Sequence, residues 1–268
     1  MWFERWIKGE TIKQLAKASG YSRSKIQRVV LRYLPIDPTD QLDLSSYKYI
    51  TFDGKFLFGR EFCLLVVFDA LTNRPIIGTV AKAESKPNIT HWLNQLKQAG
   101  LAPVAVTTDG LEAGIMAFRE IWPGIITQRC LFHIKLQVTA WCRIPPRIGL
   151  GKELSSCVDR LMHVDSPASA ESFVCEYKDI VARHRDYINT LDPKKTTDKD
   201  LKKAVVLIDK AGPNMFHYLR DARIAKTTSP LEGYFKHIQN IRGFRHNGLT
   251  EQHLFDFIKW RIYFDSTK

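Results

Sequence analysis

The order of strand-like and helix-like segments between residues 47 and 128 constrains the fold of this chain more than any other feature. Three segments rich in Ile, Val, Phe and Leu come first, and turn signals separate them. They cover residues 47–58, 61–68 and 75–81. A helix, a short strand, a second helix and a last short strand follow at residues 88–98, 104–107, 111–121 and 125–128. The order predicts a mixed sheet in which an antiparallel meander is continued by parallel strands joined through helices.

This order is that of an RNase H-like core, an α/β fold with helices flanking a mixed sheet. We expect the core in two parts, residues 47–143 and 223–268. Residues 132–222 contain no further convincing strand and predict helices with loops, and we expect residues 144–222 to form an all-helical insertion between the two parts. Residues 35–46, proline-punctuated and acidic, are expected to form a linker that precedes the core.

Residues 1–34 predict a helix-turn-helix segment that binds DNA. Thr11 and Ser22 are suited to cap its two helices, and the glycine of Ser19-Gly20-Tyr21 suits a tight turn between them. The second helix carries side chains of types that contact phosphates and base edges. These are Arg23, Lys25, Gln27 and Arg28. The alternative is a small helical bundle whose basic outer face is merely solvated.

The charge balance indicates a polyanionic partner. The chain has 40 Lys and Arg against 28 Asp and Glu, a net charge of +12, and neutralising phosphates releases condensed counterions. Ribosomal, RNA-binding and membrane-surface proteins share this property, so charge alone names a class of partner. Near the C-terminus, Arg242 and Arg245 belong to a basic cluster that suits a phosphate backbone, although a solvated helix end is the commoner meaning of such runs.

Cysteine usage and hydropathy predict the compartment. The five cysteines are an odd number without the cadence of a disulfide framework, which is typical of a reduced intracellular protein. The first residues lack the apolar segment of a signal peptide, and the longest apolar run, residues 62–68, is far too short to cross a membrane. We therefore expect a soluble cytoplasmic protein with no membrane partner.

Acidic residues are the first candidates for catalytic groups, because two-metal phosphodiester chemistry needs carboxylates that converge from different elements. Asp53 lies within the first strand. Asp53-Gly54 could instead form a hairpin turn, but residues 55–58 continue the strand. A turn explains Asp69 fully. Asp109 ends a strand at the edge where α/β sheets bind ligands, and it could also cap the helix that follows.

Three further residues have competing interpretations. Residues 229–232, Ser-Pro-Leu-Glu, form a capping box, and this local role alone accounts for Glu232. Cys130 and His133 are spaced like half of a zinc site, but no second Cys/His pair stands at a plausible distance along the chain. His133 could contact DNA phosphate or orient a scissile group, and a buried structural pair is an equal alternative.

Taken together, four motifs in this order resemble those of the Mutator-like transposases and their bacterial insertion-sequence relatives. They are Phe52-Asp53-Gly54, Thr107-Thr108-Asp109-Gly110, Cys130-x-x-His133 and Thr227-Thr228-Ser229-Pro230-Leu231-Glu232. The resemblance spans about residues 47–248. It implies a catalytic triad of Asp53, Asp109 and Glu232 that holds two Mg²⁺ or Mn²⁺ ions, with Cys130 and His133 close by.

A transposase of this type cuts DNA and transfers the exposed 3′ ends to a target. The resemblance therefore also implies double-stranded DNA as the partner (transposon ends and target), a homodimer or higher assembly on DNA, and association with the nucleoid. Two alternatives remain at this point. One is a non-catalytic DNA-binding regulator or domesticated transposase. The other is an RNase H-fold nuclease, which uses the same acids to cut DNA without joining it.

Overall fold

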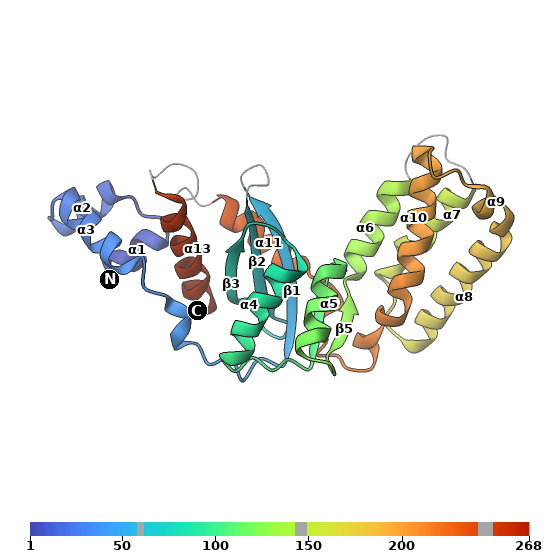
Figure 1. Cartoon of the computed structure of the whole chain (residues 1–268), viewed down its shortest axis with the longest axis horizontal. Coiled ribbons are helices and arrows are strands. Elements are labelled where there is room, and N and C mark those ends of the chain that lie inside the picture. Colours follow the sequence, from blue (N-terminus) through green and yellow to red (C-terminus); the bar gives the residue numbers. More distant parts are fainter. Residues whose placement is uncertain (58–61, 143–148, 241–248, 268) are drawn as a thin grey trace.

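The structure, a computed structural model, describes residues 1–57, 62–142, 149–240 and 249–267, without the side chains of residues 40 and 41. A five-stranded sheet lies at its centre, in the order β3-β2-β1-β4-β5 (Figure 1). The strands are β1 (Tyr49–Leu57), β2 (Phe62–Asp69), β3 (Arg74–Ala81), β4 (Ala105–Thr108) and β5 (Ile126–Arg129). The pairs β1–β2 and β2–β3 are antiparallel, whereas β1–β4 and β4–β5 are parallel. This is the predicted mixed sheet with flanking helices, and it is compatible with an RNase H-like core.

The sheet is covered on both faces, which explains why β2 is buried from Cys63 to Asp69. Successive side chains of a strand point to opposite faces. Leu65 and Val67 pack against α4 (Lys86–Gln98) and α5 (Glu112–Ile121), whose buried side chains include Trp92 and Phe118. On the other face, Leu64, Val66 and Phe68 pack with buried residues of α11 (Ser229–Asn240) and α13 (Glu251–Ser266).

The N-terminal helices belong to the same core as α11 and α13. They are α1 (Trp2–Ile7), α2 (Ile12–Ser19) and α3 (Arg23–Tyr33). Thr11 and Ser22 cap α2 and α3 as expected, and Gly20 ends α2 with φ 70°. Phe3 meets Trp260 of α13 edge-on, with ring centroids 4.9 Å apart. The 3₁₀ helix η1 (Pro38–Gln41) then leads toward the sheet.

Residues 149–211 form helices that have a separate hydrophobic core, together with α6. The helices are α6 (Leu131–Cys142), α7 (Gly149–Leu161), α8 (Pro167–Arg183), α9 (Arg185–Thr190) and α10 (Thr196–Ala211). Two short 3₁₀ helices, η3 (Gly212–Asn214) and η4 (His217–Leu219), return the chain toward the sheet. There Gln128 of β5 donates to the Met215 carbonyl at 2.7 Å and accepts from the His217 amide at 2.9 Å. The helices α7–α10 and the N-terminal helices lie at opposite ends of the molecule (Figure 1).

Several element boundaries differ from the predictions. The helix expected at residues 88–98 begins earlier, at Lys86, because a proline is well accommodated in the first turn of a helix. The helical segment expected from about residue 230 to the C-terminus comprises two helices, α11 and α13, and residues 241–248 between them lie outside the described part. Among the helices that the structure describes, none is long and apolar enough to cross a membrane.

Candidate metal centre

Asp53 lies in the middle of β1, where its Cα pairs with Val66 of β2. Because β1 continues to Leu57, Asp53-Gly54 does not form a hairpin turn. The side chain is only 6% exposed, and one carboxylate oxygen accepts a hydrogen bond from the Gly54 amide at 2.8 Å. An acid in a central strand is costly to bury, so its position calls for a partner of positive charge.

Asp69 is equally buried but differs from Asp53 in its surroundings. It ends β2, and its carboxylate accepts hydrogen bonds from the Leu71 amide and from the amide and hydroxyl of Thr72. These contacts close the turn into β3, as the sequence predicted. Asp69 is therefore a structural acid and a natural reference for Asp53.

Asp109 directly follows β4, at the carboxyl ends of the parallel strands, where the sequence predicted ligand binding. One carboxylate oxygen accepts from the Leu111 amide at 2.9 Å and lies 3.2 Å from the Thr108 hydroxyl, so the residue braces the turn that enters α5. Gly110 has φ 100° and lies against the Arg129 side chain, so this position suits glycine. Arg129 donates to the backbone carbonyl of Asp109 at 3.2 Å.

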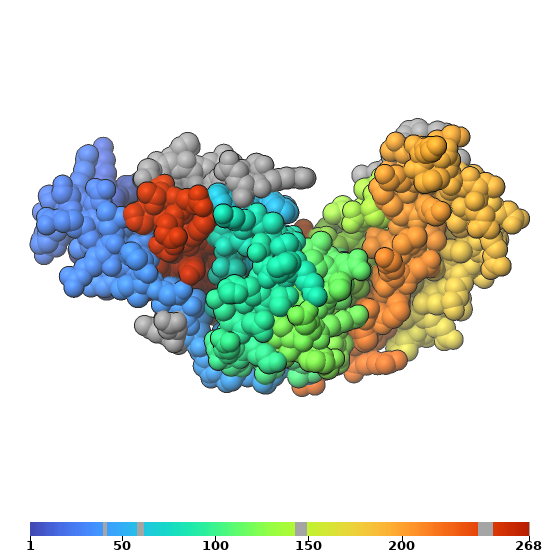
Figure 2. Space-filling view, in the orientation of Figure 1, coloured from blue at the N-terminus to red at the C-terminus, as the bar shows by residue number. Residues whose placement is uncertain are grey.

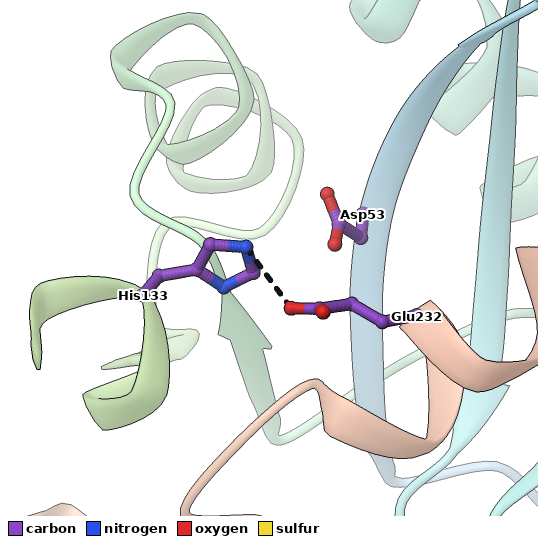
Figure 3. A group of neighbouring side chains, drawn as sticks. All are labelled: Asp53, His133 and Glu232. Carbon is purple, nitrogen blue, oxygen red and sulfur yellow. Dashed lines mark ion pairs between the residues drawn. The ribbon is translucent and has the colours of Figure 1, made fainter. Parts of the chain in front are cut away.

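Glu232 lies in the first turn of α11, which begins at Ser229. Its carboxylate points toward His133 and Asp53 rather than along its own helix (Figure 3). Ligand atoms of Asp53, His133 and Glu232 all lie within 4.8 Å of one another. These three residues, here called the metal-site cluster, come from β1, α6 and α11. Asp109 is not among the three.

The charges of the cluster are incompletely balanced. His133 Nε2 lies 3.2 Å from Glu232 Oε1 but is not aligned as a hydrogen bond, and this buried oxygen has no hydrogen-bond partner in the described part of the chain. Burial raises the pKa of Asp53 to about 7, and the charges of Asp109 and Glu232 add to the effect. Asp109 is thus near enough to act on Asp53 electrostatically, although its carboxylate is turned toward the α5 turn.

Cys130 and His133 lie where β5 leads into α6, and both contact Thr228 in the segment before α11. The thiol of Cys130 is fully buried and accepts from the amide of Thr228 at 3.3 Å, and Thr228 Oγ1 lies 3.4 Å from His133 Nδ1. Burial alone lowers the pKa of His133, but Cys130, Asp53 and Asp109 outweigh it and raise the pKa to about 9. The structure therefore places His133 in the metal-site cluster, and it places Cys130 next to His133 but outside the cluster.

A fourth carboxylate, Glu84, was not anticipated from the sequence. It follows β3, and its Oε1 atom is buried without a hydrogen-bond partner among the described residues. The carboxylate lies against Gly54, where an added Cβ would be 2.3 Å from Oε1. Burial, Asp109 and Asp53, in that order, raise the pKa of Glu84 to about 7. In the sequence, Glu84 is one charged residue in a polar loop. The only sign of its later contact is Gly54, whose missing side chain leaves room for another group next to Asp53.

This donor set fits a divalent cation. In the described part of the chain, no Lys or Arg forms an ion pair with Asp53, Glu84 or Glu232, and one buried carboxylate oxygen of Glu84 and one of Glu232 lack a hydrogen-bond partner. A cation held between these groups would offset the cost of burying them. Carboxylates suit Mg²⁺ and Mn²⁺, whereas an imidazole among the ligands suits later transition metals such as Zn²⁺.

Four of the residues predicted to contact DNA lie on α3, at the end of the molecule that the N-terminal helices form (Figure 1). They are exposed, and they do not belong to the metal-site cluster: Arg23, Lys25, Gln27 and Arg28. Lys25 Nζ lies over the Tyr21 ring, 3.6 Å from its centroid. Arg23 and Gln27 line a cavity between α3 and the start of α13. The other two predicted residues, Arg242 and Arg245, lie outside the described residues.

Comparisons with known proteins add no family to these observations. No protein-family model matches the chain. No curated protein matches it either.

Proposed function

We propose that this chain is a DDE transposase, which cuts DNA and transfers the exposed 3′ ends to a target with the help of two Mg²⁺ or Mn²⁺ ions. The triad is Asp53, Asp109 and Glu232. The observation that carries the proposal is the approach of Asp53 and Glu232 to His133, with Asp109 close enough to raise the pKa of Asp53. These are the positions that resemble the motifs of the Mutator-like transposases.

The contrast between Asp53 and Asp69 favours a metal-dependent function over a structural one. Both aspartates are almost completely buried in β1 and β2. The carboxylate of Asp69 is satisfied by the turn that it closes, whereas Asp53 faces other acids. Burying like charges together costs a large free energy when no counter-ion is bound, so the surroundings of Asp53 are those of a cation site.

Bound ions would activate the attacking water or 3′-hydroxyl and stabilise the leaving oxygen. The protein residues supply position and charge. Asp53 is held by its central strand, and Asp109 by the Leu111 amide. Glu232 is more accessible, with 31% of its side chain exposed, so its carboxylate can adjust its position to hold a bound ion. His133, positively charged at neutral pH in the metal-free protein because its pKa is raised to about 9, can donate to a phosphate oxygen.

The remainder of the proposal concerns DNA. We propose that α2 and α3 act as a helix-turn-helix, with the exposed side chains of α3 against the duplex. The helices between α6 and α11 would be the all-helical insertion of the family, and the net charge of +12 suits phosphate contacts along the surface. Assembly on two DNA ends as a homodimer or larger complex belongs to the same proposal.

The test is a Mg²⁺ and Mn²⁺ titration of cleavage and joining, on DNA that carries the ends flanking the gene. Wild type is compared with Asp53→Asn and with the buried control Asp69→Asn. We expect metal-dependent 3′-hydroxyl joining that is lost in Asp53→Asn and kept in Asp69→Asn.

Two outcomes would overturn the proposal. Cutting without joining would establish a nuclease. DNA binding without metal dependence or cleavage, equal in all three proteins, would establish a non-catalytic regulator. A Zn²⁺ arm distinguishes a structural zinc site, which would bind the ion without supporting cleavage.

A further inference from the structure

Arg129 is the last residue of β5, and its guanidinium is buried beside Asp109. The residue is 7% exposed, and its Nε atom is buried without a hydrogen-bond partner in the described part of the chain. Arg261 of α13 is similarly buried, but it donates to the Asp265 carboxylate at 2.8 Å. Buried arginines are normally paired with an acid in this way. Among the described residues Arg129 forms no such ion pair, so its burial needs another explanation.

The register of the parallel strands brings Arg129 close to two acids of the proposed triad. Thr108 of β4 pairs with Phe52 of β1 on one side and with Arg129 of β5 on the other. Asp53 and Asp109 each directly follow a paired residue, so they lie on neighbouring strands where the pairing of β1 with β4 ends. Paired side chains lie on the same face of a sheet, and Phe52 packs on the face that α4 and α5 cover. Arg129 therefore approaches Asp109 from that face, whereas Asp53 points to the opposite one.

The turn after Asp109 is in contact with Arg129 at two points. The Nη2 atom of Arg129 donates to the Asp109 carbonyl at 3.2 Å, and a Cβ at Gly110 would overlap the guanidinium. The Asp109 carboxylate is held separately, since the Leu111 amide and the Thr108 hydroxyl both donate to Oδ1. Its second oxygen, Oδ2, accepts no hydrogen bond from the described residues. Arg129 thus fixes the backbone at Asp109 and leaves one carboxylate oxygen available to a cation.

The burial of Arg129 separates it from surfaces that DNA could reach. Figure 2 shows that the molecule is hollowed between the part around the sheet and the helices α8–α10, and α6 lies along this hollow (Figure 1). Arg129 precedes α6, but with 7% exposure its guanidinium lies inside the protein rather than on the wall of the hollow. Any effect of Arg129 on a bound ion or on DNA therefore passes through the residues that it contacts.

We propose that Arg129 is a positioning residue for Asp109, and that it holds the Asp109–Gly110 backbone so that Oδ2 of Asp109 can bind a divalent ion together with Asp53. Residues that orient a metal ligand from outside the coordination shell typically contribute roughly 10- to 100-fold to metal affinity. The charge of Arg129 by itself would repel the ion, so the contribution comes from geometry. The inference rests on the proposed function, because it assumes that Asp109 is a ligand of the ion.

The experiment is a calorimetric titration of the whole chain with Mn²⁺, without DNA. Arg129→Met keeps the length of the side chain but removes its charge and its donors, whereas Arg129→Lys keeps a charge and one donor group. Arg119→Met, which removes an exposed arginine of α5, is the control. We expect Arg129→Met to weaken Mn²⁺ binding roughly tenfold. The affinity of Arg129→Lys should lie between those of Arg129→Met and wild type, and Arg119→Met should bind as wild type does.

A positioning role differs in sign from the two simpler roles of a buried arginine. If Arg129 acted only through its charge, Arg129→Met would bind Mn²⁺ more tightly, because a positive charge beside the ion is removed. If Arg129 were merely structural, Arg129→Met would lower the Tm in EDTA and leave the Mn²⁺ affinity unchanged. Either result would overturn the proposal, and so would equal Mn²⁺ affinities of Arg129→Lys and Arg129→Met. We expect the Tm of Arg129→Met to stay near that of wild type, since methionine replaces the guanidinium without leaving a carboxylate unpaired.

Asp109→Asn separates this inference from the proposed function. If Asp109→Asn binds Mn²⁺ as wild type does, Asp109 is not a ligand, and both the triad and the role of Arg129 are refuted. If Asp109→Asn weakens binding and Arg129→Met does not, the triad stands and only the positioning role is wrong. Weaker binding in both variants, with partial recovery in Arg129→Lys, is the result that the proposal requires.

Discussion

Replacing Asp53 with asparagine is expected to stabilise the metal-free protein, although the residue lies in the centre of the sheet. Burial and the neighbouring acids raise the pKa of Asp53 from 3.8 to about 7. One pH unit of difference between folded and unfolded states corresponds to about 1.36 kcal/mol, so the ionised carboxylate destabilises the fold by at most about 4 kcal/mol. Asparagine keeps the shape and the acceptor for the Gly54 amide while removing the charge.

The pH dependence follows from the direction of the shift. The folded protein binds the Asp53 proton more tightly than the unfolded chain does, so wild type loses stability as the pH rises from about 4 to about 7. The asparagine side chain of the variant does not titrate. The difference in stability between Asp53→Asn and wild type should therefore be small at pH 4 and reach about 2 to 4 kcal/mol at pH 8.

Thermal unfolding in EDTA at several pH values measures this difference, with a gain of roughly 5 to 15 °C in Tm expected at pH 8. Asp69→Asn is the control of opposite sign, because its carboxylate accepts three hydrogen bonds and its loss should cost about 1 to 2 kcal/mol. Added Mg²⁺ should stabilise wild type more than Asp53→Asn. A loss of stability in Asp53→Asn comparable with that in Asp69→Asn would refute the inference that Asp53 lies among unneutralised acids.

Further predictions concern the neighbours of Asp53. Glu84→Gln should raise the Tm of the metal-free protein at pH 8 and weaken Mn²⁺ binding severalfold in calorimetry, and unchanged affinity would exclude Glu84 from the site. Gly54→Ala should weaken Mn²⁺ binding similarly without changing any charge, because the added methyl would displace the Glu84 carboxylate; normal affinity in this variant would contradict the contact. Cys130→Ala should lower the pKa of His133 from about 9, measured by NMR titration, and should destabilise the fold by about 1 to 2 kcal/mol. An unchanged His133 titration would mean that Cys130 does not contribute to its charge.

The sequence by itself determined the succession of strands and helices around the sheet and the placement of two aspartates. Strand-length apolar runs separated by turn signals sufficed for the meander and the parallel extension, because periodicity reports whether an element is a strand or a helix. Continuation of the strand beyond Gly54 identified Asp53 as an acid in the middle of a strand, and Asp69-Ala70-Leu71-Thr72 identified a turn. Both conclusions depend on neighbours along the chain, which is why they could be drawn from local pattern.

Only the tertiary structure decided which acids meet. Glu232 stands in a motif that a helix cap explains locally, and its approach to Asp53 depends on how α11 packs on the sheet. Glu84 carries no local signal, and it approaches Asp53 because the segment after β3 brings its carboxylate against Gly54, which has no Cβ to obstruct the contact. The exposure of Leu136 on α6 likewise cannot be read from the sequence, where this leucine resembles the buried apolar residues around it. Periodicity tells which side of an element is apolar, whereas contacts between distant elements depend on strand register and helix packing, which no short stretch of sequence specifies.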